Sequence, residues 1–113
     1  MAQLLSRRGA LAALLAMAAA RVAQAHGPQQ VTIAKLVYAP AETTLHVGDT
    51  VTWVNNDPIA HTATAKADAP GGPWEVMLPP GKSAAMQMMT AGTIDYYCRF
   101  HPNMKARITV LTK

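Results

Sequence analysis

A cysteine, a histidine and a methionine stand three residues apart near the end of the chain, at Cys98, His101 and Met104. Their side chains offer a thiolate, an imidazole and a thioether. A trigonal site of two His and one Cys with a long axial Met suits copper that alternates between Cu(I) and Cu(II). The spacing therefore predicts a copper site that needs a second histidine from elsewhere. His61 is the best candidate, because it follows a turn that ends a predicted strand.

The cysteine count supports this interpretation, because Cys98 is the only cysteine of the chain. An unpaired cysteine indicates an intermolecular disulfide, a reactive thiol or a metal ligand. In an oxidising compartment thiols normally pair. With His101 and Met104 beside it, we interpret Cys98 as a metal ligand.

Residues 1–25 have the features of an export signal. Arg7 and Arg8 precede an apolar run, and Ala23-Gln24-Ala25 fits a small-x-small cleavage site. The run is about a dozen residues, shorter than the roughly 20 that span a bilayer. The two arginines also resemble a twin-arginine signal. We expect cleavage after Ala25, a periplasmic location and no membrane insertion of the remaining chain.

The remaining chain, residues 26–113, is nearly neutral. It carries seven of the ten Lys and Arg residues and all six Asp and Glu residues. A net charge of +1 gives no case for binding nucleic acid. A chain of this length makes one small domain with a single core.

Short segments of alternating apolar and polar residues predict β-strands, and Gly48-Asp49 indicates a hairpin turn. Residues 66–74 are rich in Pro and Gly and predict a loop. About seven or eight short strands separated by turns indicate an all-β sandwich. The segments with strand character are 31–33, 44–47, 50–54, 75–78, 83–89, 92–97 and 106–111.

Three further methionines, Met86, Met88 and Met89, could also bind Cu(I) through their thioethers. We favour core packing, because Met86 and Met88 share one face of a predicted strand and Met fills irregular gaps in cores. Trp53 also lies in a predicted strand, and we interpret it as a core residue.

Together these stretches resemble the cupredoxins, the small blue copper proteins, and most closely their amicyanin/plastocyanin-like branch. The matching segments are 48–55, the isolated His61, and 92–104 with its Cys-x-x-His-x-x-Met spacing. The resemblance implies a Greek-key β-sandwich over residues 26–113 that holds one type 1 copper and transfers one electron. It implies that His61, Cys98 and His101 are the equatorial ligands and Met104 the axial one.

The resemblance also implies how the protein meets its partners. His101 would reach the surface within an apolar patch to which Pro58, Ile59, Pro102 and either Met77 or Pro79 contribute. A monomer would dock redox proteins transiently there, with an amine dehydrogenase as donor and a c-type cytochrome as acceptor.

Two positions depart from the family's pattern, and Ala106, where relatives often have Gly, is expected to alter only the exit of the loop. Where relatives have Asn after the first histidine ligand, this chain has Thr62, so we expect the side-chain brace between the two ligand loops to be shorter or absent. The backbone N–H of Thr62 can still donate to the sulfur of Cys98, and hydrogen bonds around the ligands tune a metal site.

Two other functions use some of the same residues. A periplasmic copper carrier or resistance protein would hold and pass on the ion with the same ligands. A copper-dependent oxygenase would chelate copper through His26, the first residue after cleavage, and needs a second histidine, for which His46 remains. One site filled by protein ligands, with no open coordination position, favours a protein that is not an enzyme.

Overall fold

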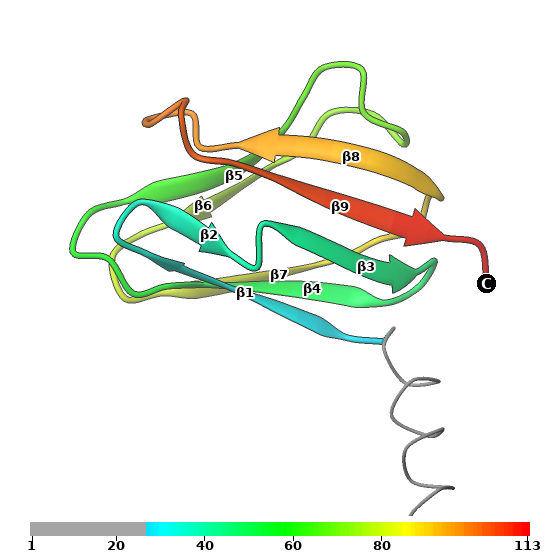
Figure 1. Cartoon of the computed structure of the whole chain (residues 1–113), viewed down its shortest axis with the longest axis horizontal. Coiled ribbons are helices and arrows are strands. Elements are labelled where there is room, and N and C mark those ends of the chain that lie inside the picture. Colours follow the sequence, from blue (N-terminus) through cyan, green and yellow to red (C-terminus); the bar gives the residue numbers. More distant parts are fainter. Residues whose placement is uncertain (1–26) are drawn as a thin grey trace, which may run out of the picture.

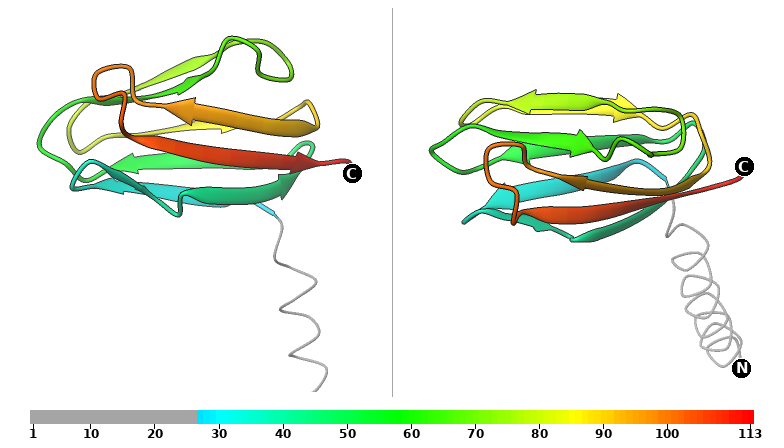
Figure 2. Two further views of the ribbon diagram at one scale, coloured as in Figure 1. Left: turned by 45° about the horizontal axis from the view of Figure 1, so that its top comes forward. Right: turned by 90° about the horizontal axis from the view of Figure 1, so that it is seen from above.

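Residues 27–113 are described by a computed structural model, and they form two β-sheets that pack face to face (Figure 1, Figure 2). Residues 1–25, predicted to be a signal, and His26 lie outside the described residues. In the described part, no helix is long and apolar enough to cross a membrane.

Nine strands make up the two sheets, one more than the upper end of the predicted number. The first sheet has the order β2-β1-β4-β7, and the second has the order β3-β9-β8-β5-β6. Two neighbouring pairs, β1 with β4 and β3 with β9, run parallel, and the remaining pairs run antiparallel. The all-β sandwich is therefore confirmed. The strands are β1 (Gln29–Ala34), β2 (Val37–Ala39), β3 (Glu42–His46), β4 (Thr50–Asn55), β5 (His61–Ala65), β6 (Glu75–Leu78), β7 (Ser83–Gln87), β8 (Gly92–Tyr97) and β9 (Lys105–Leu111).

The turn at Gly48-Asp49 exists, but the predicted hairpin is wrong. The N–H of Asp49 donates to the carbonyl of His46 at 2.9 Å, so the chain does reverse there. However, β3 pairs with β9 in one sheet and β4 pairs with β1 and β7 in the other. Leu45 and Val51 are both fully buried. The turn therefore carries the chain from one sheet to the other, because both strands cover the same core from opposite sides.

Two strands lack the alternating pattern that predicted the others. β2 is only three residues long and ends beside Pro40. β5 has the sequence His-Thr-Ala-Thr-Ala, yet four of its five residues are buried. It lies between β6 and β8. Hydrogen bonding on both edges, and not apolar side chains, makes this segment a strand.

Aromatic rings fill the space between the sheets. The rings of Trp53 and Tyr96 lie 5.8 Å apart, and Tyr38 and Trp74 contact the same Tyr96 ring at 4.9 and 6.2 Å. The indole N–H of Trp53 donates to the Tyr96 hydroxyl at 3.3 Å. Burial raises the pKa of Tyr96 to about 12. Trp53 is fully buried, which confirms its predicted place in the core.

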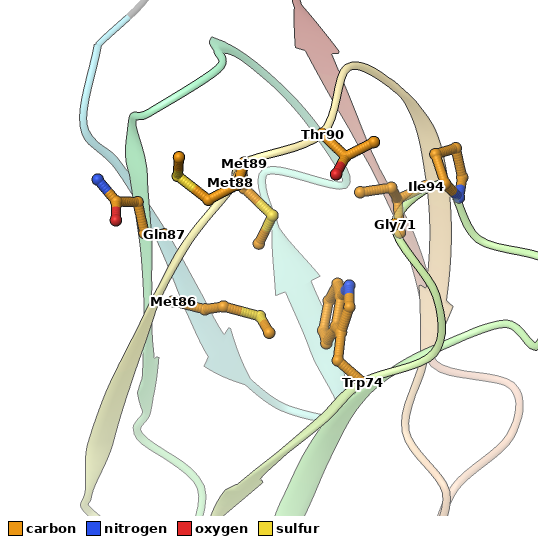
Figure 3. A pocket seen from close by; sticks show the side chains of 9 residues that line it. Gly71, Trp74, Met86, Gln87, Met88, Met89, Thr90 and Ile94 are labelled. Atoms are coloured by element: carbon orange, nitrogen blue, oxygen red, sulfur yellow. The ribbon is translucent and has the colours of Figure 1, made fainter.

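Met86 in β7 and Met88 just after that strand also pack as predicted. Met88 is buried in the core, and Met86 is partly buried against it. Figure 3 shows these side chains around a cavity of about 150 Å³ that Trp74 also lines. Met89 is 62% exposed. The prediction of core packing for Met86 and Met88 is confirmed.

Candidate metal centre

The loop between β8 and β9 supplies three of the predicted ligands. It contains two consecutive tight turns: the N–H of His101 donates to the Cys98 carbonyl at 3.2 Å, and the N–H of Met104 donates to the His101 carbonyl at 2.9 Å. The N–H of Cys98 then donates to the Met104 carbonyl at 3.1 Å, continuing the ladder of the two strands. The loop is therefore closed at its base, and it lies at one end of the sandwich (Figure 1).

His61, the fourth predicted ligand, is the first residue of β5 at the same end of the sandwich. The preceding loop is held by Asn55, which is fully buried. Its side-chain amide donates to the carbonyls of Ile59 and Leu78, both at 2.9 Å. Its carbonyl oxygen accepts the N–H of Asp57 at 2.9 Å. The Asn55 side chain thus fixes the conformation of the loop that leads to His61.

Three ligand atoms converge at this end. The Sγ of Cys98 lies 3.7 Å from Nδ1 of His61 and 3.6 Å from Nδ1 of His101, and all three atoms lie within 4.8 Å of one another. Bonds of about 2.0 Å to His nitrogen and 2.3 Å to Cys sulfur, as in zinc sites, separate the two atoms by about 3.7 Å when they meet at about 120°. The observed separations therefore fit one shared ion.

The four predicted ligands differ in exposure. His61 and Cys98 are fully buried and Met104 is 4% exposed, whereas His101 is half-buried. Met104 and His101 line the same surface depression. His101 is thus the member of the set that solvent and other proteins can reach, as the resemblance implied.

Thr62 joins the two ligand loops in two ways. Its backbone N–H donates to the Sγ of Cys98 at 3.4 Å, as predicted. Its hydroxyl oxygen accepts the backbone N–H of Arg99 at 2.8 Å. A side-chain brace is therefore present, so of the two predicted outcomes, a shorter brace or none, absence is excluded. Threonine can serve because the extended β5 places its hydroxyl directly against the residue after Cys98.

A carboxylate next to His61 was not predicted from the sequence. The Oδ2 atom of Asp57 lies 2.8 Å from Nε2 of His61. The N–H of Leu36, then the ring of His61 and the N–H of Lys35, hold the pKa of Asp57 below its ordinary value. A carboxylate of this kind only accepts hydrogen bonds, so a neutral His61 ring would carry its proton on Nε2, which leaves the lone pair on Nδ1, the nitrogen that faces Cys98.

Leu36 is another residue of this end that sequence reasoning missed. It lines the surface depression together with His101, Pro102, Asn103 and Met104, and it is 46% exposed. Leu36 precedes His101 by 65 positions and belongs to the turn between β1 and β2. No local pattern could have linked it to the site.

His46 takes no part in this cluster. It is the last residue of β3 and pairs with Leu111 at the end of β9, opposite the loop that carries the ligands. Among residues 27–113, His61, Cys98 and His101 are the only group of three or more His, Cys, Asp or Glu side chains placed to hold one ion. His26, the other residue of the oxygenase alternative, lies outside the described residues.

The donor set and the fold lead to a family assignment. Residues 7–110 match the model of the cupredoxin-like domain. The chain belongs to the cupredoxin family. Known cupredoxins similar to it include amicyanin of Paracoccus denitrificans, which is 37% identical over 98 residues that cover 82% of this chain and 71% of the relative. Amicyanin-alpha of Methylorubrum extorquens is 34% identical, covering 89% and 87% of the two chains.

Solved structures agree with the sequence relatives of this cupredoxin. A point mutant of amicyanin in its reduced state superposes with a TM-score of 0.66 at 34% identity, covering 74% of this chain and 82% of that one. Plastocyanin of Scenedesmus fuscus is 36% identical over 85 residues, covering 66% of this chain and 87% of the relative. Copper is the ion that this family and this donor set indicate, and electron transport, not catalysis, is the activity class.

Proposed function

We propose that this cupredoxin is a periplasmic one-electron carrier whose single type 1 copper is held by His61, Cys98, His101 and Met104. The observation that carries the proposal is the convergence of Sγ of Cys98 with two histidine Nδ1 atoms at 3.6 and 3.7 Å. Bound copper supplies a one-electron Cu(I)/Cu(II) couple, and thiolate, imidazole and thioether donors suit both oxidation states.

The residues around the ligands keep this arrangement rigid. Asn55 fixes the loop before His61, and Thr62 connects that strand to the Cys98 loop by two hydrogen bonds. A site that cannot rearrange freely keeps the ligand atoms in nearly the same place in both oxidation states. Low reorganisation is what an electron carrier needs, because each transfer then requires little movement of the protein.

We place partner docking at the end of the sandwich where His101 is accessible. Leu36, Ile59 and Met77 are 44–46% exposed, and Pro102 is also exposed. Exposed apolar side chains around a small ligand-bearing surface suit a transient interface, which is typically smaller than about 1,200 Å². A periplasmic amine dehydrogenase as donor and a c-type cytochrome as acceptor fit such a role.

The sequence of residues 1–25 supports the periplasmic part of the proposal. Residues 1–25 would direct the chain to the periplasm and be removed after Ala25, leaving residues 26–113 as a single copper-binding domain. N-terminal sequencing of the protein from the periplasmic fraction tests this. Mature protein beginning at His26 is expected, and protein retained in the cytoplasm with its first residues intact would contradict it.

The copper site is tested by titrating the chain without residues 1–25 with Cu(II), followed by ascorbate and reoxidation. We expect an intense blue band and a narrow copper hyperfine splitting in the EPR spectrum at one copper per chain, bleached and restored reversibly. A pale complex that gives up its copper on reduction, or to a competing chelator in either state, would instead identify a copper carrier.

The docking surface is tested by stopped-flow electron transfer to a c-type cytochrome. Leu36→Ser should slow the second-order reaction, because it removes an apolar side chain beside His101. Met89→Ser is the matched control, since Met89 is also an exposed apolar residue but follows β7 at the opposite end. Equal rates for the two variants would move the docking site elsewhere.

A further inference from the structure

The turn between β1 and β2 has an unusual backbone for its sequence. Lys35 and Leu36 form a two-residue connection, and their φ angles are +53° and +63°. Positive φ at both central positions defines the turn that glycine and asparagine favour in such hairpins. For Lys and Leu this left-handed backbone is unfavourable, because the β-carbon crowds the following carbonyl. Some other contact must hold the turn in place.

Asp57 provides that contact. Its Oδ1 accepts the N–H of Lys35 at 2.6 Å, and its Oδ2 accepts the N–H of Leu36 at 3.0 Å. The two turn amides that face away from the hairpin are thereby both satisfied by one carboxylate. Asp57 is itself only 9% exposed, whereas the side chains of Lys35 and Leu36 are exposed.

The same carboxylate also holds the buried ligand. Oδ2, which accepts the Leu36 N–H, lies 2.8 Å from Nε2 of His61. One oxygen atom is therefore shared between the turn that carries Leu36 and the ring whose other nitrogen faces Cys98. Leu36 in turn lines the depression beside His101.

We infer that Asp57 is a positioning residue that ties the orientation of the His61 ring to the turn that places Leu36 beside His101. This inference rests on the proposed copper site for its effect on the metal, but its hydrogen bonds can be tested without metal. In this role Asp57 fixes which His61 nitrogen is free for copper and holds an apolar residue of the docking surface. One side chain then sets both the orientation of the His61 ring and the position of Leu36.

The first experiment uses the unaltered protein without copper. A long-range ¹H–¹⁵N NMR spectrum should show the His61 ring protonated at Nε2, and the amides of Lys35 and Leu36 should exchange slowly with solvent. A ring protonated at Nδ1, or rapid exchange of both amides, would overturn the inference whether or not the protein binds copper.

The second experiment uses Asp57→Asn, which keeps one acceptor oxygen but cannot accept from all three donors. We expect the Lys35 and Leu36 amides to exchange at least tenfold faster. We also expect copper affinity to fall about 10–100-fold, as for other partners of metal ligands, and the reduction potential to rise, because the histidine loses a carboxylate that strengthens it as a donor.

Two further variants separate a positioning role from general stability. Asp49→Asn is the matched control, because the Asp49 carboxylate also caps a turn by accepting the His46 N–H but lies at the opposite end. It should leave the copper spectrum and potential unchanged. Adding Lys35→Gly to Asp57→Asn should recover part of the lost folding stability, since glycine tolerates positive φ, without restoring copper affinity.

The outcome for Asp57→Asn decides between three roles. Faster exchange with an unchanged copper site would make Asp57 only a turn cap, and a changed copper site with normal exchange would make it only a partner of His61. Either result would overturn the shared role. Only both changes together, absent in Asp49→Asn, support it.

Discussion

The hydroxyl of Thr62 accepts the backbone N–H of Arg99 at 2.8 Å. This bond connects the residue after His61 to the residue after Cys98. Thr62 is fully buried, and its own N–H points at the sulfur of Cys98. The two loops that carry His61 and Cys98 are thus joined by a side chain and a backbone group of one residue.

Thr62→Val should therefore destabilise the protein while keeping its shape. Valine preserves the volume and the backbone N–H but leaves the Arg99 amide without its acceptor, which costs about 1–3 kcal/mol when such a group is buried. Urea unfolding of the copper-free protein measures the loss, and Thr62→Ser should recover most of it. A stability of Thr62→Val equal to that of the original chain would mean that the hydroxyl brace contributes nothing.

Cys98→Ser should abolish the sulfur-to-copper charge-transfer absorption. An alcohol oxygen replaces the thiolate, so the intense visible band loses its donor orbital, and copper affinity falls because a hard oxygen replaces a soft ligand. Absorption spectra of the Cu(II)-loaded variant check this. His46→Ala is the control and should stay blue, since His46 lies at the other end of β3. A blue Cys98→Ser protein would remove the thiolate from the site.

Met104→Leu should leave copper bound and raise the reduction potential. Removing a weak thioether donor disfavours Cu(II), and a tenfold shift in relative affinity towards Cu(I) is about 59 mV for one electron. Leucine nearly conserves the volume, so the cost in folding stability should stay below about 1.5 kcal/mol. Cyclic voltammetry gives the potential, and Met88→Leu serves as the control. If both variants kept the original potential, Met104 would not be a ligand.

Met86 and Met88 line a cavity, and we expect them to contribute to folding stability and not to bind a second copper. Met88→Ala should cost about 2–5 kcal/mol, because it enlarges a void in the core, whereas Met88→Leu should cost less than about 1.5 kcal/mol. Thermal or denaturant unfolding measures both. The double variant Met86→Leu with Met88→Leu should still bind one copper per chain. A second Cu(I) equivalent, bound by the original protein and lost in this variant, would show that these thioethers hold metal.

Part of the fold could be predicted from the sequence, because it depends on residues that are close together along the chain. Alternation marked most of the strands, and Met86 and Met88 fell on one buried face as two-residue periodicity requires. The strand β5 was missed, since its Thr and Ala residues carry little apolar signal and its burial comes from pairing with β6 and β8. The Gly48-Asp49 turn was found, but a turn alone does not specify which sheet each strand joins.

Residue types and their spacing along the chain fix the chemistry of the predicted ligands and the loop that carries three of the four. Cys98, His101 and Met104 lie in one short connection between adjacent antiparallel strands, so their proximity follows from local geometry. Only the tertiary structure decided that Nδ1 of His61 faces Cys98, that Thr62 braces both loops, and that Asp57 joins His61 to Leu36. These contacts link residues from different strands and turns. Which residues meet depends on how the two sheets pack around one core, and no local sequence pattern encodes that packing.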